Sequence, residues 1–483
     1  MPLREYQIDA IERIRAQLRQ KRRRPLLCLP TGGGKTLTAA AVLIAAIAKG
    51  KRVGFAAHRK ELIDQTIATF ASLGVTDVSV VRRRDKRFDP TKRVQIASVQ
   101  TLARRDPIPN VDVWVIDEAH RATAETYLRH LFEAYPNAVF LGLTATPCRG
   151  SGKPLGDVWD SLVIGARYSE LIEAGHIVEP VIYSTPTQAD LSSCRTTGGD
   201  YNLDDLEAAV NRGALIGNLV AEWQRHNDGR RTVVFAVSVA HSRAIVAQFA
   251  SVGVAAEHLD GTTPESEREA ILARLERGET AVVSNVGVLC EGWDMPSVKC
   301  CVLARPTKSL GLYMQMSGRT LRPFDDVTPI ILDHGGNVDR MRLKYGGNGY
   351  PHDDREWSLD AKPKATGSAN VKLCRFCFGY IAASCRTCPL CSASAEAPEM
   401  GQRDLSEEIA VELTKRTQAE KIQATPLPEW TRELDGDPRM VATFRSLLRK
   451  QIALNYKPGW IRHLFEAATK AQLPRKWAER CGA

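Results

Sequence analysis

The chain has 483 residues, more than one ordinary hydrophobic core can organise, and this length corresponds to about three domains. Lys and Arg outnumber Asp and Glu by 66 to 56, so the net charge of +10 and the isoelectric point near 9.0 favour a polyanionic partner, for which nucleic acid is the obvious candidate. No apolar run reaches the roughly 18 residues that a membrane span requires, and the first residues lack a signal-peptide core, so we expect a cytoplasmic protein with no membrane partner.

The first motif lies near the N-terminus, between a predicted strand at 25–29 and an alanine-rich predicted helix at 37–49. Its sequence is Leu29-Pro30-Thr31-Gly32-Gly33-Gly34-Lys35-Thr36. In a strand, loop and helix of this kind, glycines let the backbone approach phosphates, the lysine reaches the β and γ phosphates, and the threonine offers its hydroxyl to magnesium. The segment therefore predicts a nucleotide site, although Leu29 stands where the general phosphate-loop pattern has glycine.

Two carboxylates follow a second predicted strand, the apolar and β-branched run 111–116. Asp117 and Glu118 come directly after it, and the carboxyl edge of a parallel sheet is where α/β proteins bind their ligands. We expect Asp117 to hold Mg²⁺ and Glu118 to orient and deprotonate an attacking water.

A fresh alternation of strands and helices begins near Val178. Its apolar strand candidates and its helix candidates are 232–236, 280–284 and 298–304, and 240–252 and 264–277. Further along, Gln315, Arg319 and Arg322 are spaced four and three residues apart, which predicts that they share one face of a helix. Such a face can offer two cations to a phosphate.

Two Cys-x-x-Cys pairs, Cys374 with Cys377 and Cys388 with Cys391, follow a linker-like stretch and are separated by ten residues. Four thiolates at this spacing suit one tetrahedral Zn²⁺, which would staple a unit too small to bury a sufficient core. Cys385 is a spare thiol that could replace Cys388 or Cys391, and an iron–sulfur cluster is the chemical competitor. The unit is either a pure staple or a nucleic-acid finger, and a finger would present Arg375, Phe376, Tyr380 and Arg386.

The last part of the chain is basic and carries aromatic residues. From Arg439 to the end there are ten Lys or Arg against two Glu. The interleaved aromatic residues are Phe444, Tyr456, Trp460, Phe465 and Trp477. The pattern suits a nucleic-acid platform, and it equally suits a small helical domain with an aromatic core and solvated arginines.

In their order along the chain, these motifs resemble those of superfamily-two helicases of the DEAH-box type. The resemblance covers roughly residues 1–345, and the Leu29 departure is ordinary in that family. The matching segments are 4–7, 29–36, 117–120, 143–147, 291–294 and 315–322.

The resemblance implies an enzyme that hydrolyses ATP with Mg²⁺ between two RecA-like α/β lobes. The residues implied for ATP binding are Arg4, Gln7, Thr31, Gly32, Gly33, Gly34, Lys35, Thr36 and Asp294. Those implied for Mg²⁺ are Thr36 and Asp117, and those implied for catalysis are Lys35, Glu118, Gln315, Arg319 and Arg322. The residues that would couple hydrolysis to movement are His120, Thr144 and Thr146. Those that would contact nucleic acid are His58, Arg59, Gln100, Thr101, Val237 and Asn285.

The same reasoning divides the chain into five segments. They are lobe 1 at 1–165, lobe 2 at 166–345, a linker at 346–370, a zinc ribbon at 371–395 and a basic helical region at 396–483. Residues 169–175, 332–337 and 456–460 resemble more closely the bacterial and phage helicases that carry a zinc ribbon, a group that includes the RadD-type repair helicases.

This closer resemblance implies an ATP-dependent DNA helicase or duplex translocase in repair or remodelling, with DNA favoured over RNA. An RNA helicase, a nucleic-acid clamp and the motor subunit of a restriction or defence complex stay open as alternatives. The zinc ribbon and the C-terminal region are candidate contacts for a protein partner.

Overall fold

The structure, a computed structural model, describes residues 3–83, 85–102, 109–120, 122–150, 155–394, 425–435, 437–454, 459–469 and 471–481. The chain divides into two compact units, residues 1–400 and 401–483. Within the described ranges, no helix combines the length and the apolar composition needed to cross a bilayer.

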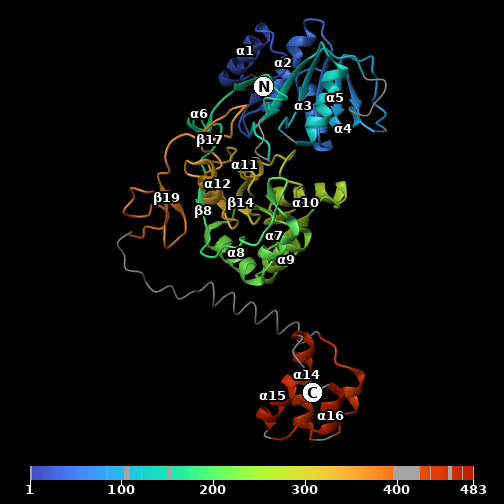
Figure 1. The fold of residues 1–483 in the computed structure, drawn as a ribbon, viewed down its shortest axis with the longest axis vertical. Helices are drawn as coiled ribbons and strands as arrows, with labels where there is room; N and C mark the ends of the chain where they lie inside the picture. Colours follow the sequence, from blue (N-terminus) through green and yellow to red (C-terminus); the bar gives the residue numbers. More distant parts are fainter. Residues whose placement is uncertain are drawn as a thin grey trace. The chain divides into compact units, whose positions relative to one another are not determined.

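Lobe 1 is a seven-stranded parallel sheet with helices packed on its faces (Figure 1). Its strand order is β3-β4-β2-β5-β6-β1-β7, so β6 alone separates β1 from β5, the two strands that precede the nucleotide motifs. Strands buried on both faces need continuous apolar runs, and such runs predicted β1 and β5. The elements are α1 (Glu5–Arg19), β1 (Pro25–Cys28), α2 (Lys35–Ile47), β2 (Val53–Ala57), α3 (Lys60–Ser72), β3 (Val78–Val81), β4 (Val94–Ser98), α4 (Val99–Leu102), β5 (Val113–Ile116), α5 (Ala122–Ala134), β6 (Val139–Thr144), β7 (Ser161–Ile164) and α6 (Tyr168–Glu173).

Lobe 2 is a six-stranded parallel sheet of order β12-β13-β11-β14-β15-β8. The predicted α/β class with two RecA-like sheets is thus confirmed, and the predicted strands and helices of this lobe are present within two residues of their expected ends. The elements are β8 (Val181–Tyr183), β9 (Thr196–Thr197), β10 (Asp200–Tyr201), α7 (Leu203–Val210), α8 (Gly213–His226), β11 (Arg231–Phe235), α9 (Val239–Ser251), β12 (Ala256–Leu259), α10 (Glu265–Arg277), β13 (Val282–Asn285), β14 (Val298–Leu303), α11 (Leu310–Ser317), β15 (Ile330–Leu332) and α12 (Asn337–Tyr345).

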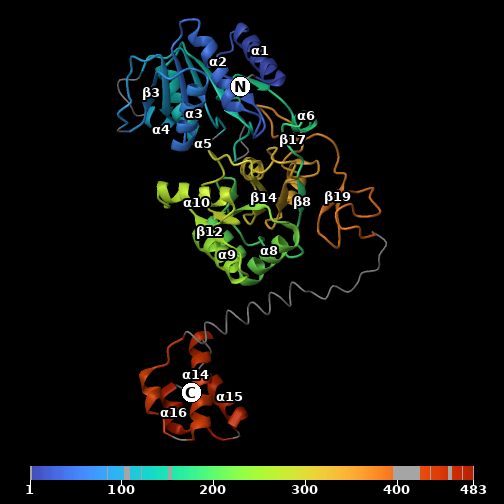
Figure 2. The same cartoon turned by 180° about the vertical axis from the view of Figure 1, so that it is seen from behind.

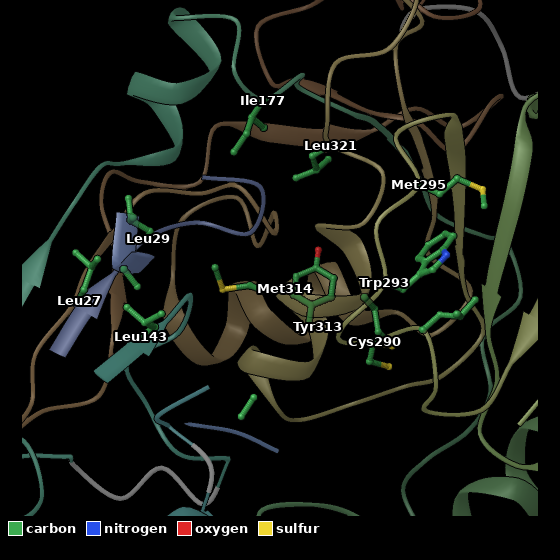
Figure 3. Packing of buried hydrophobic residues seen from close by; sticks show 14 of the residues in the cluster. Leu27, Leu29, Leu143, Ile177, Cys290, Trp293, Met295, Tyr313, Met314 and Leu321 are labelled. Atoms are coloured by element: carbon green, nitrogen blue, oxygen red, sulfur yellow. The ribbon is translucent and has the colours of Figure 1, made fainter. Parts of the chain in front are cut away.

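The two lobes share a continuous apolar core. Leu29 and Leu143 of lobe 1 belong to the same buried cluster as Met314 and Leu321 of lobe 2, and Ile177 from the connection joins them (Figure 3). The lobes therefore meet through packed side chains beside the glycine-rich loop, so a change in this packing affects both lobes.

The chain returns to lobe 1 after lobe 2. In the segment 346–370, for which the sequence predicts a linker, β16 (Arg355–Glu356) pairs antiparallel with β17 (Lys364–Ala365). The carbonyl of Leu359 accepts hydrogen bonds from the amides of Leu155 and Gly156, at 2.9 and 3.0 Å. This segment therefore ties the end of lobe 2 back to lobe 1.

The cysteine-rich unit lies against the edge of the lobe 2 sheet, beside β8 (Figure 2). Its strands β18 (Val371–Leu373) and β19 (Tyr380–Ala382) form an antiparallel pair. Gly379 bridges to Tyr183 of β8, and the amide of Ser184 donates to the carbonyl of Phe378 at 2.8 Å. The unit thereby covers the open edge of the lobe 2 sheet.

The C-terminal unit is a small helical domain with an aromatic core. Its elements are a 3₁₀ turn at Glu429–Glu433, α14 (Pro438–Leu454), α15 (Gly459–Thr469) and α16 (Arg475–Cys481). Phe444 and Phe465 are fully buried and Trp477 is nearly so. These three aromatics therefore form a core rather than a stacking platform, whereas Tyr456 and the side chain of Trp460 lie outside the described residues.

Candidate functional site

The last position of the glycine-rich loop favours glycine, both for its left-handed backbone and for the space around it. Gly34 caps the N-terminus of α2 with φ +74°, and a Cβ there would collide with the side-chain amide of Gln7. That amide donates to the carbonyls of Gly33 and Gly34, each at 3.4 Å, while the Arg4 amide donates to Gln7 Oε1 at 2.9 Å. Gln7 therefore braces the loop at the start of a helix, where peptide N–H groups attract anions.

The side chain of Lys35 extends back to the first residue of the loop motif, Leu29. Lys35 Nζ donates to the carbonyl of Leu29 at 3.5 Å, and Thr36 stands next to it at the start of α2. Thr31 is buried at the opposite end of the loop. The residues predicted to bind phosphate thus lie together between β1 and the first turn of α2.

Asp117 and Glu118 lie at the end of β5, as predicted, and both are buried. Glu118 has φ +47°, a strained conformation for a residue with a side chain, and its amide donates to Asp117 Oδ1 at 3.0 Å. Burial, and then the charge of Glu118, raise the pKa of Asp117 to about 7, while Lys35 opposes this shift. Two acids held out of water fit a site that takes a cation.

The predicted coupling residues form one hydrogen-bonded group. His120 Nδ1 lies 2.9 Å from Thr144 Oγ1 and 3.4 Å from Glu118 Oε2. Thr144 Oγ1 also accepts from the amide of Thr146 at 2.9 Å. The loop after β6 is therefore linked to the acid pair through a histidine.

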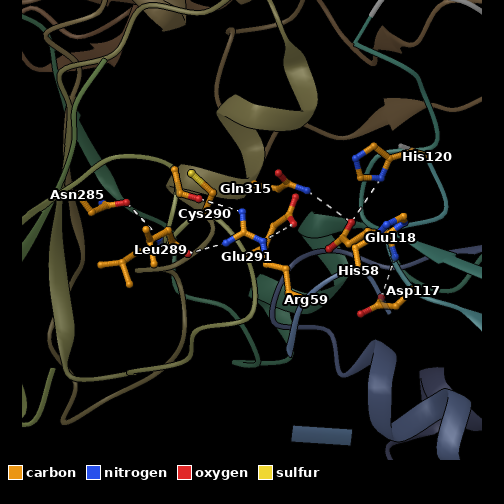
Figure 4. A network of polar contacts seen from close by, with 12 residues as sticks. His58, Arg59, Asp117, Glu118, His120, Asn285, Leu289, Cys290, Glu291 and Gln315 are labelled. Atoms are coloured by element: carbon orange, nitrogen blue, oxygen red, sulfur yellow. Dashed lines mark hydrogen bonds and ion pairs between the residues drawn. The ribbon is translucent and has the colours of Figure 1, made fainter. Parts of the chain in front are cut away.

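Lobe 2 contributes to this site through α11 and the turn after it. Gln315 Nε2 donates to Glu118 Oε2 at 3.4 Å (Figure 4). The helix ends at Ser317, so the prediction that Gln315, Arg319 and Arg322 share one helical face is wrong. The next residue, Gly318, has its Cα against lobe 1: a Cβ at this position would lie 2.8 Å from Thr31 Cβ.

The two arginines are nevertheless held at the cleft. Arg319 is buried and donates to the carbonyls of Cys290, at 3.1 and 2.6 Å, and Trp293, at 2.6 Å. Burial lowers the pKa of Arg319 from its usual value, and burial lowers that of Arg322 to about 10. Arg322 pairs with Asp294 and lies beside the glycine-rich loop, since a Cβ at Gly32 would be 3.6 Å from Arg322 Cγ.

Arg59, predicted to contact nucleic acid, bridges the two lobes in this structure. Its guanidinium donates to the carbonyls of Gly287 and Val288, at 2.9 and 3.1 Å. It also lies 3.4 Å from the Glu291 carboxylate (Figure 4). Gln65 Nε2 adds a hydrogen bond to the Gly292 carbonyl at 2.8 Å. Sequence reasoning missed Gln65, because a lone glutamine on a polar helix face carries no signal.

The other predicted nucleic-acid contacts divide into two groups. Gln100 is exposed and its amide lies 3.4 Å from the carbonyl of His58, with Thr101 next to it, so these three residues are close together. Val237 and Asn285 are buried, and the Asn285 side chain bonds the carbonyl of Val234 and the amide of Leu289. A contact at Val237 or Asn285 would therefore use backbone atoms.

The four predicted zinc ligands converge. The sulfurs of Cys374, Cys377, Cys388 and Cys391 all lie within 4.8 Å of one another, and Cys385 stands outside this group. The two Cys-x-x-Cys turns have the same backbone arrangement. The residue after each turn, Phe378 or Ser392, has a positive φ, +55° or +60°. Its amide donates to the carbonyl of the first cysteine, Cys374 at 3.0 Å or Cys388 at 2.8 Å. Two such turns facing each other can supply a tetrahedral set of sulfurs.

Two family models match the lobes, the res subunit of type III restriction enzymes (ResIII) over residues 1–149 and the helicase conserved C-terminal domain over 213–323. A 51.5 kDa protein of a Lactococcus phage (isolate 7-9) is 30% identical over 406 residues, which cover 83% of this chain and 84% of that protein, so the two belong to one family. This chain is a superfamily-two helicase.

The helicase is a nucleic-acid-dependent ATPase by this membership. It is 32% identical over 343 residues to the IRC3 protein of Saccharomyces cerevisiae, over 66% of this chain and 49% of that one. Among solved structures, its fold resembles that of the type ISP restriction-modification enzyme LlaBIII bound to DNA, with a TM-score of 0.52, 18% identity and coverage of 69% and 27%. The helicase therefore spans most of the phage protein, about half of IRC3 and about a quarter of LlaBIII.

Proposed function

We propose that the helicase moves along DNA, as a helicase or duplex translocase, and acts in DNA repair or remodelling as RadD-type helicases do. The observation that carries the choice of DNA is the match of residues 1–149, which include both nucleotide motifs of lobe 1, to the res subunit of type III restriction enzymes, which act on DNA. The net charge of +10 adds attraction to a phosphate backbone that any sequence of DNA offers.

The geometry supports a division of labour in ATP hydrolysis. Gln7 and the peptide groups of the glycine-rich loop bind the nucleotide, Lys35 takes the β and γ phosphates, and Glu118 orients and deprotonates the water. Thr36 and Asp117 would hold Mg²⁺, which neutralises phosphate charge when bound. Two buried acids beside a single lysine fit that divalent cation.

Lobe 2 contributes residues to the ATP site, and this links ATP hydrolysis to movement of the lobes. Arg319 and Arg322 supply positive charge where charge develops on the γ-phosphate, so ATP favours contact between the lobes and ADP releases it. His120, Thr144 and Thr146 transmit the state of Glu118 to the loop after β6. Hydrolysis is thereby coupled to relative movement of the lobes on the DNA backbone.

The zinc unit acts as a staple for lobe 2 in this proposal. The four convergent thiols fit Zn²⁺, held by Cys374, Cys377, Cys388 and Cys391, and the backbone bridge to β8 ties the unit to the sheet edge. Tyr380 is buried, so it is not available to a bound nucleic acid, whereas Arg375 and Arg386 are exposed. A staple at a sheet edge is the role that these contacts favour.

The direct test compares ATP hydrolysis by the full chain without nucleic acid and with single-stranded DNA, duplex DNA, forked DNA and RNA. We expect DNA to stimulate turnover and RNA to do so weakly. Stimulation by RNA alone would overturn the choice of DNA. Two further assays distinguish a helicase from a duplex translocase. A helicase separates the strands of a forked duplex, whereas a duplex translocase displaces a triplex-forming strand.

A further inference from the structure

A lysine is buried in lobe 2 close to the nucleotide cleft. Lys299 of β14 is 2% exposed, and its ammonium donates to the main-chain carbonyl of Arg322. Among the residues that the structure describes, it forms no ion pair, and Asp325 is the acid that acts on it from farther away. Taking an ammonium out of water without a close carboxylate is costly, so a gain elsewhere must offset it.

The local strand geometry places this side chain. Arg231 of β11 pairs with Val298, but its neighbour Thr232 pairs with Cys300, so Lys299 is one extra residue in β14. Bulges of this kind re-aim a side chain and are common next to active sites. Regular alternation would place Val298 and Cys300 on one face of the sheet, but they pack into different apolar clusters on its two faces, because Lys299 is inserted between them.

The carbonyl that Lys299 holds belongs to the turn that presents Arg322. The preceding carbonyl, of Leu321, accepts a hydrogen bond from the amide of Val178 at 2.7 Å, so both carbonyls of the turn are fixed. The Arg322 side chain extends from this turn to Asp294 and to the glycine-rich loop at Gly32. Backbone contacts thus fix the base of a side chain that passes beside the glycine-rich loop and pairs with Asp294.

We propose that Lys299 is a positioning residue for ATP hydrolysis. It fixes the main chain at Arg322, so that the Arg322 guanidinium stays at the phosphate site when ATP replaces Asp294 as its partner. This inference rests on the proposed role of Arg322. Lys299 itself touches neither the nucleotide loop nor the acid pair, so it acts only through the position of Arg322.

The test compares Lys299→Met, Lys299→Gln and Lys299→Arg with Arg322→Ala in steady-state ATP hydrolysis by the full chain. For Lys299→Met we expect kcat to fall about tenfold or more with KM for ATP within threefold, since the arginine matters most in the transition state. Lys299→Gln keeps a neutral donor and Lys299→Arg keeps the charge, so each should recover part of the loss. Lys92→Met is the matched control, because that ammonium also donates to a main-chain carbonyl, that of Val78 at 3.2 Å, and Lys92 precedes β4, at the edge of the lobe 1 sheet opposite the nucleotide motifs.

The double variant decides whether Lys299 acts through Arg322. We expect Lys299→Met with Arg322→Ala to be no slower than Arg322→Ala alone, whereas losses that multiply would overturn the positioning role. Wild-type turnover in Lys299→Met beside an inactive Arg322→Ala would also overturn it and leave the proposed function intact. Wild-type turnover in Arg322→Ala would refute the arginine assignment itself. Should Lys299→Met not fold, the same comparisons are made with Lys299→Gln.

Discussion

Gln315 of lobe 2 donates a hydrogen bond to the carboxylate of Glu118 in lobe 1, with 3.4 Å between Nε2 and Oε2. The same oxygen lies 3.4 Å from His120 Nδ1. The group that we assign as the base is therefore held from both sides of the cleft, and these contacts help to maintain its strained backbone, at φ +47°. Closure of the lobes and orientation of the base are one event in this arrangement.

Glu118→Gln should abolish most of the ATP hydrolysis while ATP still binds. The amide has nearly the size of the carboxylate and can still meet Gln315, but it cannot take a proton, so we expect kcat to fall by about 10² or more. Turnover is measured beside the affinity for a fluorescent ATP analogue. Hydrolysis at the wild-type rate would refute the assignment, and Glu133→Gln on the exposed face of α5 is the control.

Arg59→Ala separates an interlobe role from a nucleic-acid contact. Because Arg59 bonds the segment 287–291, whose neighbouring carbonyls hold Arg319, we expect the variant to lower ATP turnover several-fold even without DNA. Gln65→Ala should show a smaller loss of the same kind, through Gly292.

The competing outcome for Arg59→Ala is specific. If Arg59 only contacts the DNA backbone, basal turnover stays at the wild-type level and the DNA concentration for half-maximal stimulation rises. Lys92→Ala is the control, since Lys92 pairs with Asp77 within lobe 1.

Much of this site could be predicted from sequence because its ligands are local. Gly32–Thr36 and Asp117–Glu118 each follow an apolar strand, and a parallel sheet brings strand ends to one edge whatever lies between them. The bracing of Gly34 by Gln7, and the bonds of Arg319 to the 290–293 carbonyls, depend on how distant segments pack. The prediction of one helical face for Gln315, Arg319 and Arg322 was wrong because helical spacing does not show where a helix ends, and α11 ends at Ser317. Lys299 was missed because a bulge leaves no signature in a strand sequence.

Loss of a cysteine ligand should release metal and loosen the edge of lobe 2. We expect the purified chain to carry one Zn²⁺, measured by elemental analysis, and Cys388→Ser to lose most of it, because Cys388 Sγ belongs to the convergent set of four. Hydrogen exchange should then rise in β18, in β19 and in β8, which Gly379 bridges. Cys385→Ser should retain the metal. A Cys388→Ser protein with a full complement of zinc would contradict this ligand set.

The stability of lobe 2 should fall in mild acid through His241. This imidazole is 2% exposed, accepts a hydrogen bond from the Val237 amide at 3.4 Å, and burial lowers its pKa from 6.5 to about 4. The unfolded chain therefore binds the proton first as the pH drops, and the folded state loses stability between about pH 6.5 and pH 4, by about 3 kcal/mol at the acid end. His241→Gln keeps an acceptor for Val237 but has no proton to gain, so it should reduce this dependence; His334, whose pKa burial also lowers to about 4, should account for the part that remains. Chemical denaturation at pH 7 and pH 4.5 measures the difference, with the exposed His130→Gln as control. An equal loss in wild type and His241→Gln would show that another group carries the acid sensitivity.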